Sequence, residues 1–188
     1  MSMKNSVPGD ISALPVDLSG RRVIVTAGAA GIGAAIAAAF AERGARVHVC
    51  DVDAQALAAC PHPNARADVG RREEIDRYMQ DALAQLGGLD VLVNNAGIAG
   101  PTAGIADIAP QELDATLGIN LASQFHTVRH ALPALRSAGG GSIINVSSVA
   151  GRMGVPMRTP YAATKWGVVG LTRSLAMELG GYGIRVNA

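Results

Sequence analysis

Aromatic residues are scarce in this chain of 188 residues, where they make up 3% of the sequence. Only 16% of the residues are charged, whereas 49% are apolar. This composition excludes an intrinsically disordered chain, because enough apolar surface is present to form a core. The core must be built mainly from Ala, Val, Ile and Leu, and 188 residues suffice for one domain of this kind.

The chain also lacks runs of one charge, and its net charge is only +1. Nothing in it therefore favours binding to nucleic acid or to an anionic membrane surface. No apolar run is long enough to cross a bilayer, and residues 1–18 lack the apolar core of a signal peptide. We therefore expect a cytoplasmic protein with a flexible tail over residues 1–18 and one domain over residues 19–188.

Cysteine is rare as well, with Cys50 and Cys60 as the two examples. We interpret both as small hydrophobic residues, and a disulfide between them is the less favoured alternative because nothing suggests secretion. His126 and His130 have the i, i+4 spacing of a zinc-binding pair on a helix, but no third ligand accompanies them. The sequence therefore predicts no metal site, and these histidines are expected on a solvent-facing or subunit-contact surface.

Short Val- and Ile-rich runs alternate with helical patterns along the whole chain. This alternation is typical of a parallel sheet covered by helices on both faces. Right-handed crossovers then give a doubly wound, Rossmann-like α/β fold. The predicted strands are 22–26, 46–51, 65–68, 89–94, 142–147 and 184–187, and the predicted helices are 31–43, 54–59, 71–86, 110–137 and 160–180.

The expected helix 110–137 carries an apolar stripe when its residues are projected at about 100° each. The stripe consists of Leu113, Leu117, Leu121, Phe125, Val128, Leu132 and Leu135. Asn120 lies at the edge of this stripe, where a buried carboxamide either bonds to the backbone or has a function. The pattern by itself leaves both interpretations of Asn120 open.

A glycine-rich turn over residues 26–33 follows the first expected strand, and a helix begins within it. Glycines at positions 28, 31 and 33 allow the backbone to approach a pyrophosphate closely, and the N-terminus of the helix supplies free amides. The alternative is that the glycines serve only the packing of the strand against the helix. The turn therefore indicates a dinucleotide site only in combination with other signals.

Asp51 provides one such signal, because it ends the next strand 18 residues after Gly33. A carboxylate at this place accepts hydrogen bonds from an adenosine ribose and repels a 2′-phosphate. Since Ala30 and Val52 offer no cation to such a phosphate, the pattern favours NAD over NADP. The alternative is that Asp51 is the N-cap of the following helix.

Tyr161 and Lys165 are one helical turn apart and follow Ser148 by 13 and 17 residues. Their spacing places both side chains on one face of a helix, for which Thr159 is the expected N-cap and Pro160 the first residue. A phenol with its usual pKa of about 10 is a poor acid–base group at pH 7, but a nearby ammonium favours its ionised form. The pair alone is equally compatible with a chance arrangement on an exposed helix.

Seven motifs, taken in order, resemble those of the short-chain dehydrogenase/reductase family in its single-domain branch. They are the turn 26–33, Asp51, Asp68-Val69, Asn94-Asn95-Ala96-Gly97, Asn120, Ser147-Ser148 and Tyr161-Ala162-Ala163-Thr164-Lys165. Each motif is weak alone, but their order and spacing are specific together. The resemblance extends from about residue 19 to the end of the chain.

The resemblance implies a role for each of these positions. Tyr161 would be the general acid–base group, while Lys165 would favour its ionised form and bind the nicotinamide ribose. Ser148, rather than Ser147, would hold the substrate oxygen, and Asn120 would kink its helix and hold a water that passes the proton outward. The implied cofactor contacts are Gly28, Gly31, Ile32, Gly33, Asp51, Asp68, Val69, Asn95, Ala96, Gly97, Tyr161 and Lys165. The motif Asn94-Asn95-Ala96-Gly97 would also steady the sheet.

The family further implies a homo-oligomer, a tetramer or a dimer, formed through the helices 110–137 and 160–180. Trp166 is a candidate for that surface and equally a candidate for the core. The sequence departs from the family at Ala27, where the turn usually has glycine, and at Ala188, where the chain ends near the close of the sixth strand. A seventh strand is therefore expected to be missing, as in a C-terminally truncated member.

These expectations together predict an oxidoreductase that transfers a hydride between NAD(H) and a secondary alcohol or ketone. The alternative is a non-catalytic nucleotide-binding or regulatory fragment of this family, and a sugar-nucleotide epimerase or dehydratase is less favoured. The segments 99–108 and 152–158 are expected to border the substrate pocket. Arg152 or Arg158 is a candidate to meet an anionic group there, although an exposed arginine is the favoured interpretation of both.

Overall fold

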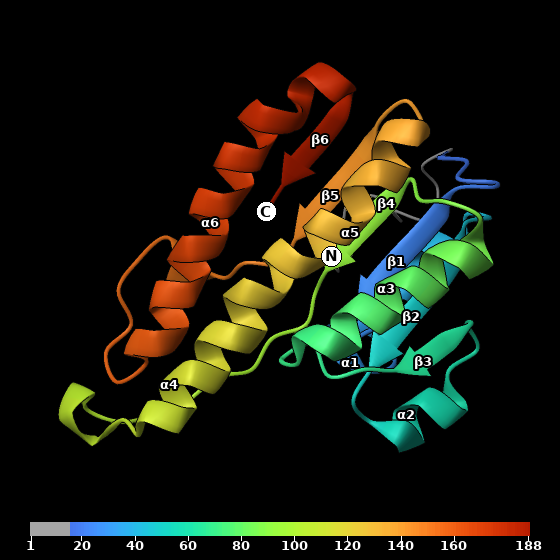
Figure 1. The fold of residues 1–188 in the computed structure, drawn as a ribbon. Helices are drawn as coiled ribbons and strands as arrows, with labels where there is room; N and C mark the ends of the chain where they lie inside the picture. Colours follow the sequence, from blue (N-terminus) through green and yellow to red (C-terminus); the bar gives the residue numbers. More distant parts are fainter. Residues whose placement is uncertain (1–15) are drawn as a thin grey trace, which may run out of the picture.

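The computed structural model describes residues 16–188, so most of the predicted tail lies outside the described residues. Six strands form one sheet: β1 (Arg22–Thr26), β2 (Arg46–Asp51), β3 (Asn64–Arg66), β4 (Val91–Asn94), β5 (Gly141–Asn145) and β6 (Ile184–Asn187). All are parallel, in the order β3-β2-β1-β4-β5-β6 (Figure 1). The chain moves outward from β1 to β3 and then returns to place β4 on the other side of β1. The crevice beyond the ends of β1 and β4 is where such sheets bind ligands.

Helices cover both faces of this sheet (Figure 1). They are α1 (Gly31–Ala41), α2 (Ala54–Ala59), α3 (Arg72–Leu86), α4 (Pro110–Leu117), α5 (Ser123–Ser137) and α6 (Thr159–Leu179). Four short helices accompany them: η2 (Ile105–Asp107), η3 (Gly118–Ala122), η4 (Val149–Gly151) and η5 (Gly180–Tyr182). Side chains of α3, α5 and α6 pack with Ile24, Leu92 and Ile143 on one face, while α1 and α2 pack with Val25 and Val49 on the other.

The predicted doubly wound α/β fold is confirmed, and most predicted element ends differ from the observed ones by no more than two residues. One correction concerns the start of α6, because Thr159 lies inside the helix and Arg158 occupies the N-cap position. The carbonyl of Arg158 already accepts a bond from the Ala162 amide at 2.9 Å. No helix within residues 16–188 is both long and apolar enough to cross a membrane.

The helix predicted over residues 110–137 is divided into α4 and α5 by η3, a five-residue π-helical segment that contains Asn120. The predicted apolar stripe is partly wrong, because Leu113 and Leu117 are each 38% exposed and Phe125 is 54% exposed. The buried face combines Val128 and Leu135 of the predicted stripe with buried polar residues, namely Thr116, Asn120, Ser123, Gln124 and Thr127. Each of these residues makes a hydrogen bond, although Oε1 of Gln124 has no partner, so hydrophobicity alone does not mark the buried face.

A buried network of polar side chains joins this face to the sheet. Asn94 of β4 donates to the Asn145 side chain of β5 at 2.9 Å and accepts from the Thr127 hydroxyl at 2.7 Å. Asn145 donates in turn to the Thr172 hydroxyl of α6 at 3.0 Å. The network fixes α5 and α6 against the central strands, which agrees with the sheet-steadying role expected of the motif that begins at Asn94.

Candidate active site

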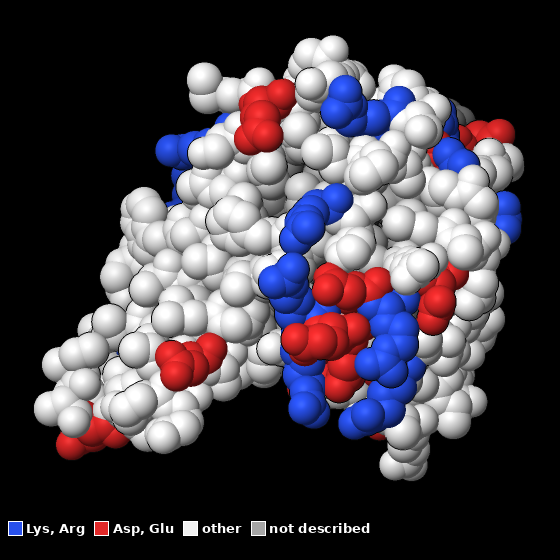
Figure 2. Space-filling view, in the orientation of Figure 1, with Lys and Arg blue, Asp and Glu red and all other residues white. Residues whose placement is uncertain are grey.

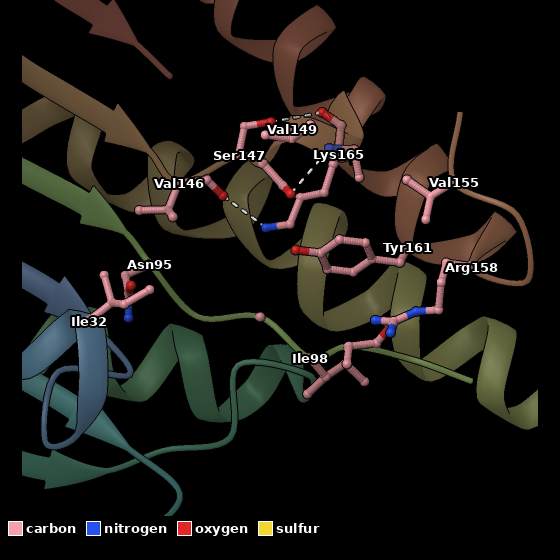
Figure 3. Close-up of a pocket in the computed structure, with 14 residues that line it drawn as sticks. Ile32, Asn95, Ile98, Val146, Ser147, Val149, Val155, Arg158, Tyr161 and Lys165 are labelled. Carbon is pink, nitrogen blue, oxygen red and sulfur yellow. Dashed lines mark hydrogen bonds between the residues drawn. The ribbon is translucent and has the colours of Figure 1, made fainter. Parts of the chain in front are cut away.

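A cavity of about 490 Å³ opens beside the carboxyl ends of β4 and β5 and the first turns of α6 (Figure 3). It is lined by Ile32, Asn95, Gly97, Ile98, Ala99, Val146, Ser147, Ser148, Val149, Ala150, Val155, Arg158, Tyr161 and Lys165. Three predicted catalytic residues, Ser148, Tyr161 and Lys165, therefore meet in one space. The predicted cofactor residues that are not part of this lining are Gly28, Gly31, Gly33, Asp51, Asp68, Val69 and Ala96.

Lys165 is held in a fixed position at the base of this cavity. It is only 4% exposed, and its ammonium donates a hydrogen bond of 2.9 Å to the carbonyl oxygen of Val146 (Figure 3). Burial lowers the pKa of Lys165 below its usual value, because the charged form loses solvation. A Cβ atom at Gly97 would lie 3.2 Å from the side-chain oxygen of Asn120, so the close packing beside Lys165 favours glycine.

Tyr161 lies on the same face of α6 as Lys165, as the i, i+4 spacing predicts. The Lys165 nitrogen is 5.6 Å from the centre of the Tyr161 ring. Figure 3 shows the phenolic oxygen directed toward the side of the cavity where this nitrogen lies. The lysine charge is thus close enough to act on the phenol electrostatically.

The two adjacent serines differ in what their hydroxyl groups contact. Ser147 donates to the carbonyl oxygen of Lys165 at 3.1 Å, which ties the end of β5 to α6. The Ser148 oxygen accepts from the Ala150 amide at 3.2 Å as the N-cap of η4. Accepting this bond leaves the Ser148 proton free to be donated into the cavity.

Asn120 is fully buried behind the cavity. Its side-chain oxygen accepts from the Ile98 amide at 2.7 Å, and its side-chain nitrogen donates to the Ile98 carbonyl at 2.9 Å. These bonds match the interpretation of Asn120 as a buried carboxamide that bonds to backbone. They also fix the cavity wall at Ile98, and the predicted water relay stays a prediction.

Close packing explains two glycines of the turn 26–33. A Cβ atom at Gly28 would lie 2.7 Å from the Val49 side chain, and one at Gly33 would overlap the carbonyl oxygen of Ala27. The Asn95 side chain donates to the carbonyl oxygens of Thr26 and Ala27, each at 3.0 Å, and so holds the turn against the end of β4. Packing therefore accounts for glycine at these two positions, and it is compatible with a dinucleotide at the same turn.

Asp51 is tied to this turn as well, because its carboxylate accepts from the Ala29 amide at 3.1 Å and from the Val52 amide at 2.8 Å. The N-cap interpretation of Asp51 is wrong, since Asp53 caps α2 through bonds to the amides of residues 55 and 56. Sequence reasoning overlooked Arg66, the β3 partner of Asp51 in the strand register. Its guanidinium donates to the Val52 carbonyl at 3.3 Å, so a cation does lie near this site.

Ala27 has a φ angle of 49°, a left-handed conformation that costs a non-glycine residue about 1–2 kcal/mol. This is the position where the sequence departs from the family's glycine. We expect Ala27→Gly to stabilise the protein by up to about 1 kcal/mol, because relief of the strain exceeds the added entropy of the unfolded chain. Urea unfolding measures the change.

The matched control is Ala35→Gly, in the exposed part of α1, which should destabilise the protein by about 1 kcal/mol. Equal destabilisation by both substitutions would show that Ala27 carries no relievable strain.

Arg158 is the main site residue that sequence reasoning misjudged. It lines the cavity, with the centre of its guanidinium 5.2 Å from the centre of the Tyr161 ring, and its Nη2 donates to the Ala99 carbonyl at 2.7 Å. The expectation of a merely exposed arginine is therefore wrong for Arg158, whereas Arg152 is exposed and lines a different cavity. The i, i+3 spacing of Arg158 and Tyr161 could have predicted that the two side chains lie on one face of the helix.

Other predicted residues have simple structural environments. Cys50 and Cys60 are both free thiols, and burial raises the pKa of Cys50 to about 12. The Nε2 atom of His130 lies 2.6 Å from a carboxylate oxygen of Asp76 in α3. No group of three or more potential metal-binding side chains occurs in the part of the chain that the structure describes. Trp166 is 52% exposed, so it does not fill the core.

Comparison with known proteins agrees with this geometry. The family model described as short chain dehydrogenase matches residues 21–188. The chain is 38% identical over 179 residues to D-threitol dehydrogenase of Mycolicibacterium smegmatis, covering 90% of this chain and 68% of that protein. It is 40% identical over 180 residues to D-beta-hydroxybutyrate dehydrogenase of Cupriavidus necator, covering 91% and 69%.

A solved relative gives the same result for the fold. The crystal structure of a metagenomic short-chain oxidoreductase in complex with NADP superposes with a TM-score of 0.85 at 36% identity, covering 90% of this chain and 80% of the other. Both the sequence match over most of the chain and the superposition lead to one assignment. The chain belongs to the short-chain dehydrogenase family.

Proposed function

We propose that the protein is an NAD-dependent oxidoreductase that interconverts a secondary alcohol and a ketone, with Tyr161 as the general acid–base group. The observation that carries this proposal is the meeting of Tyr161, Lys165 and Ser148 in one cavity. The names of the two sequence relatives describe dehydrogenation of D-threitol and of D-beta-hydroxybutyrate. Both names favour alcohol oxidation over a non-catalytic role, and they refer to different substrates.

The residues present fit a dinucleotide cofactor. At the N-terminus of α1, the amides of the first turn have no partner within the helix, and no acidic side chain lies in that turn. Such an end attracts the negative charge of a pyrophosphate. Gly31 has no side chain, and no atom lies within 4 Å of the position that a Cβ atom would take there. This end of the helix is therefore accessible. Gly31, Ile32 and Gly33 would hold the pyrophosphate, and Asp51 would hold the adenosine ribose.

When bound, the nicotinamide ring supplies the acceptor or donor of the hydride. In the oxidative direction, the Tyr161 oxygen takes the proton of the alcohol while the Ser148 hydroxyl donates a hydrogen bond to the substrate oxygen. The Lys165 ammonium stabilises the phenolate, and the phenolate offsets part of the cost of burying that ammonium. Asn120 positions the wall of the site through its two bonds to Ile98.

The test of this proposal is hydride exchange by the purified natural protein. A panel of secondary alcohols and ketones is offered with NAD or NADH, and the absorbance of the reduced nicotinamide is followed. We expect turnover of at least one pair. If the protein binds NAD but exchanges hydride with no member of the panel, the non-catalytic alternative takes the place of this proposal.

We also propose that the protein associates with itself through α4, α5 and α6. Leu117, Phe125 and Trp166 expose apolar surface on these helices. Figure 2 shows that charged side chains gather over α3, whereas the surface over α4 is largely uncharged. An uncharged apolar surface of this kind is typical of a subunit contact.

Light scattering is expected to give a mass that is a multiple of the single chain, and Leu117→Glu is expected to lower it. Val16→Glu, which changes an exposed apolar residue ahead of β1, is the matched control and should leave the mass unchanged. A stable monomer in the unaltered protein would refute the association.

A further inference from the structure

The cavity beside Tyr161 is lined by two cations, Arg158 and Lys165, and by no acidic residue. Lys165 already donates to the Val146 carbonyl and lies close to the phenol that it serves in the proposed function. Arg158 has no comparable task, and none of the ion pairs among residues 16–188 involves it. The site therefore contains one positive charge that the proposed reaction does not use.

The guanidinium of Arg158 is also incompletely hydrogen-bonded. Its Nη2 donates to the carbonyl of Ala99, but its Nε is buried and has no hydrogen-bond partner. A guanidinium has five N–H donors in a planar arrangement, and a buried donor without a partner is costly. An acceptor entering the cavity could bond to the Nη donors that the Ala99 carbonyl does not use.

The backbone fixes Arg158 in relation to Tyr161. Arg158 is the N-cap residue of α6, and Tyr161 lies in the first turn of that helix. Met157, directly before Arg158, adopts a left-handed φ of 63°, and its carbonyl accepts from the Ala103 amide at 3.0 Å. Figure 3 shows the Arg158 guanidinium between the Tyr161 ring and Ile98, so its charge lies beside the ring of the residue assigned as the acid–base group.

We propose that the substrate is a short hydroxy acid, or the corresponding oxo acid, whose carboxylate binds Arg158. This inference rests on the proposed function and adds the substrate class. A carboxylate matches the planar donor arrangement of arginine and can bond to it at two points. The Arg158 guanidinium is 5.2 Å from the centre of the Tyr161 ring, so the substrate has few carbons between its carboxylate and its carbinol group.

The reaction follows from this placement. In oxidation, the carbinol C–H bond breaks and its hydride passes to the oxidised nicotinamide. The O–H bond breaks and its proton passes to the Tyr161 oxygen, while a C=O bond forms. The products are an oxo acid, the reduced cofactor and one proton, and the carboxylate on Arg158 is unchanged throughout.

The experiment compares each hydroxy acid with its own methyl ester, which removes the charge and keeps the carbinol group. Hydroxy acids of three to six carbons, with the hydroxyl at position 2 or 3, are assayed for kcat/KM with the unaltered protein and with Arg158→Gln. The unaltered protein should prefer one acid over its ester. In the Arg158→Gln variant, the ratio of kcat/KM for the acid to kcat/KM for its ester should fall by about 10- to 100-fold. The change should come chiefly from a higher KM for the acid.

The ratio cancels any general loss of activity, including loss caused by the contact of Arg158 with Tyr161. Arg158→Lys should restore part of the preference because it restores the charge. Arg152→Gln removes an exposed arginine of the same loop and should leave the ratio unchanged. An unaltered protein that uses esters at least as well as acids, or a ratio that Arg158→Gln does not change, would overturn the inference while the proposed function stands.

A binding measurement separates the two proposals if no substrate is turned over. That outcome contradicts the proposed function, and ligand-observed NMR of the same hydroxy acids then decides the inference. Binding to the unaltered protein that Arg158→Gln abolishes would support the carboxylate site. No binding, or equal binding to both proteins, would overturn it.

Discussion

Replacing Tyr161 by phenylalanine is expected to lower kcat by about 10²- to 10⁴-fold, the usual contribution of a general acid–base group. The substitution removes one oxygen and keeps the ring that packs near Lys165 and Arg158. The fold should therefore persist. The dissociation constant for NAD, measured by fluorescence titration, should change by no more than about twofold because the ring still fills its place in the cavity wall.

Tyr182→Phe is the matched control, because Tyr182 is 46% exposed at the far end of α6, where Arg136 lies 4.0 Å from the centre of its ring. This variant should keep the kcat of the unaltered protein. If Tyr161→Phe instead weakens NAD binding as strongly as it slows turnover, the hydroxyl acts in binding, and the acid–base role assigned to Tyr161 is refuted.

A second large effect is expected at Asp51, where the change to asparagine should lower the preference for NAD over NADP by on the order of 100-fold. At an effective dielectric constant near 20, two unit charges about 4 Å apart repel by about 4 kcal/mol, and solvent reduces this value. Asparagine keeps an oxygen that can accept the Ala29 amide bond. The turn should therefore survive, and the ratio of kcat/KM for the two cofactors measures the effect.

Asp53→Asn is the control for this experiment, since Asp53 is an acid two residues away that is occupied in capping α2. It should alter the cofactor ratio only slightly. Arg66, paired with Asp51 in the strand register, offers the competing outcome. If the unaltered protein prefers NADP and the Arg66→Gln variant does not, this cation overrides the repulsion from Asp51.

Much of the fold follows from local patterns in the chain. The strand β1 has a continuous apolar centre, β2 is rich in valine, and α3 has a regular amphipathic pattern, so both types of element could be located within about two residues. The positions of Ser148, Tyr161 and Lys165 were equally readable, because a helical spacing and a strand end place residues without knowledge of the rest of the molecule. These features depend on interactions between near neighbours in the sequence.

Tertiary structure alone decided three other features. The buried face of η3 and α5 includes polar residues because Asn94 and Ile98, which are distant in the sequence, supply partners to Thr127 and Asn120. Arg158 becomes a cavity residue because a loop 59 residues earlier brings the Ala99 carbonyl to its guanidinium.

The third of these features is the environment of Asp51, since Arg66 reaches its neighbourhood only through the pairing of β2 with β3. In all three cases, a polar or charged side chain takes its place from hydrogen bonds to partners across the fold. Hydrophobic periodicity and motif spacing carry no information about such partners, whereas they locate most of the strands and helices and the motifs that predict the site.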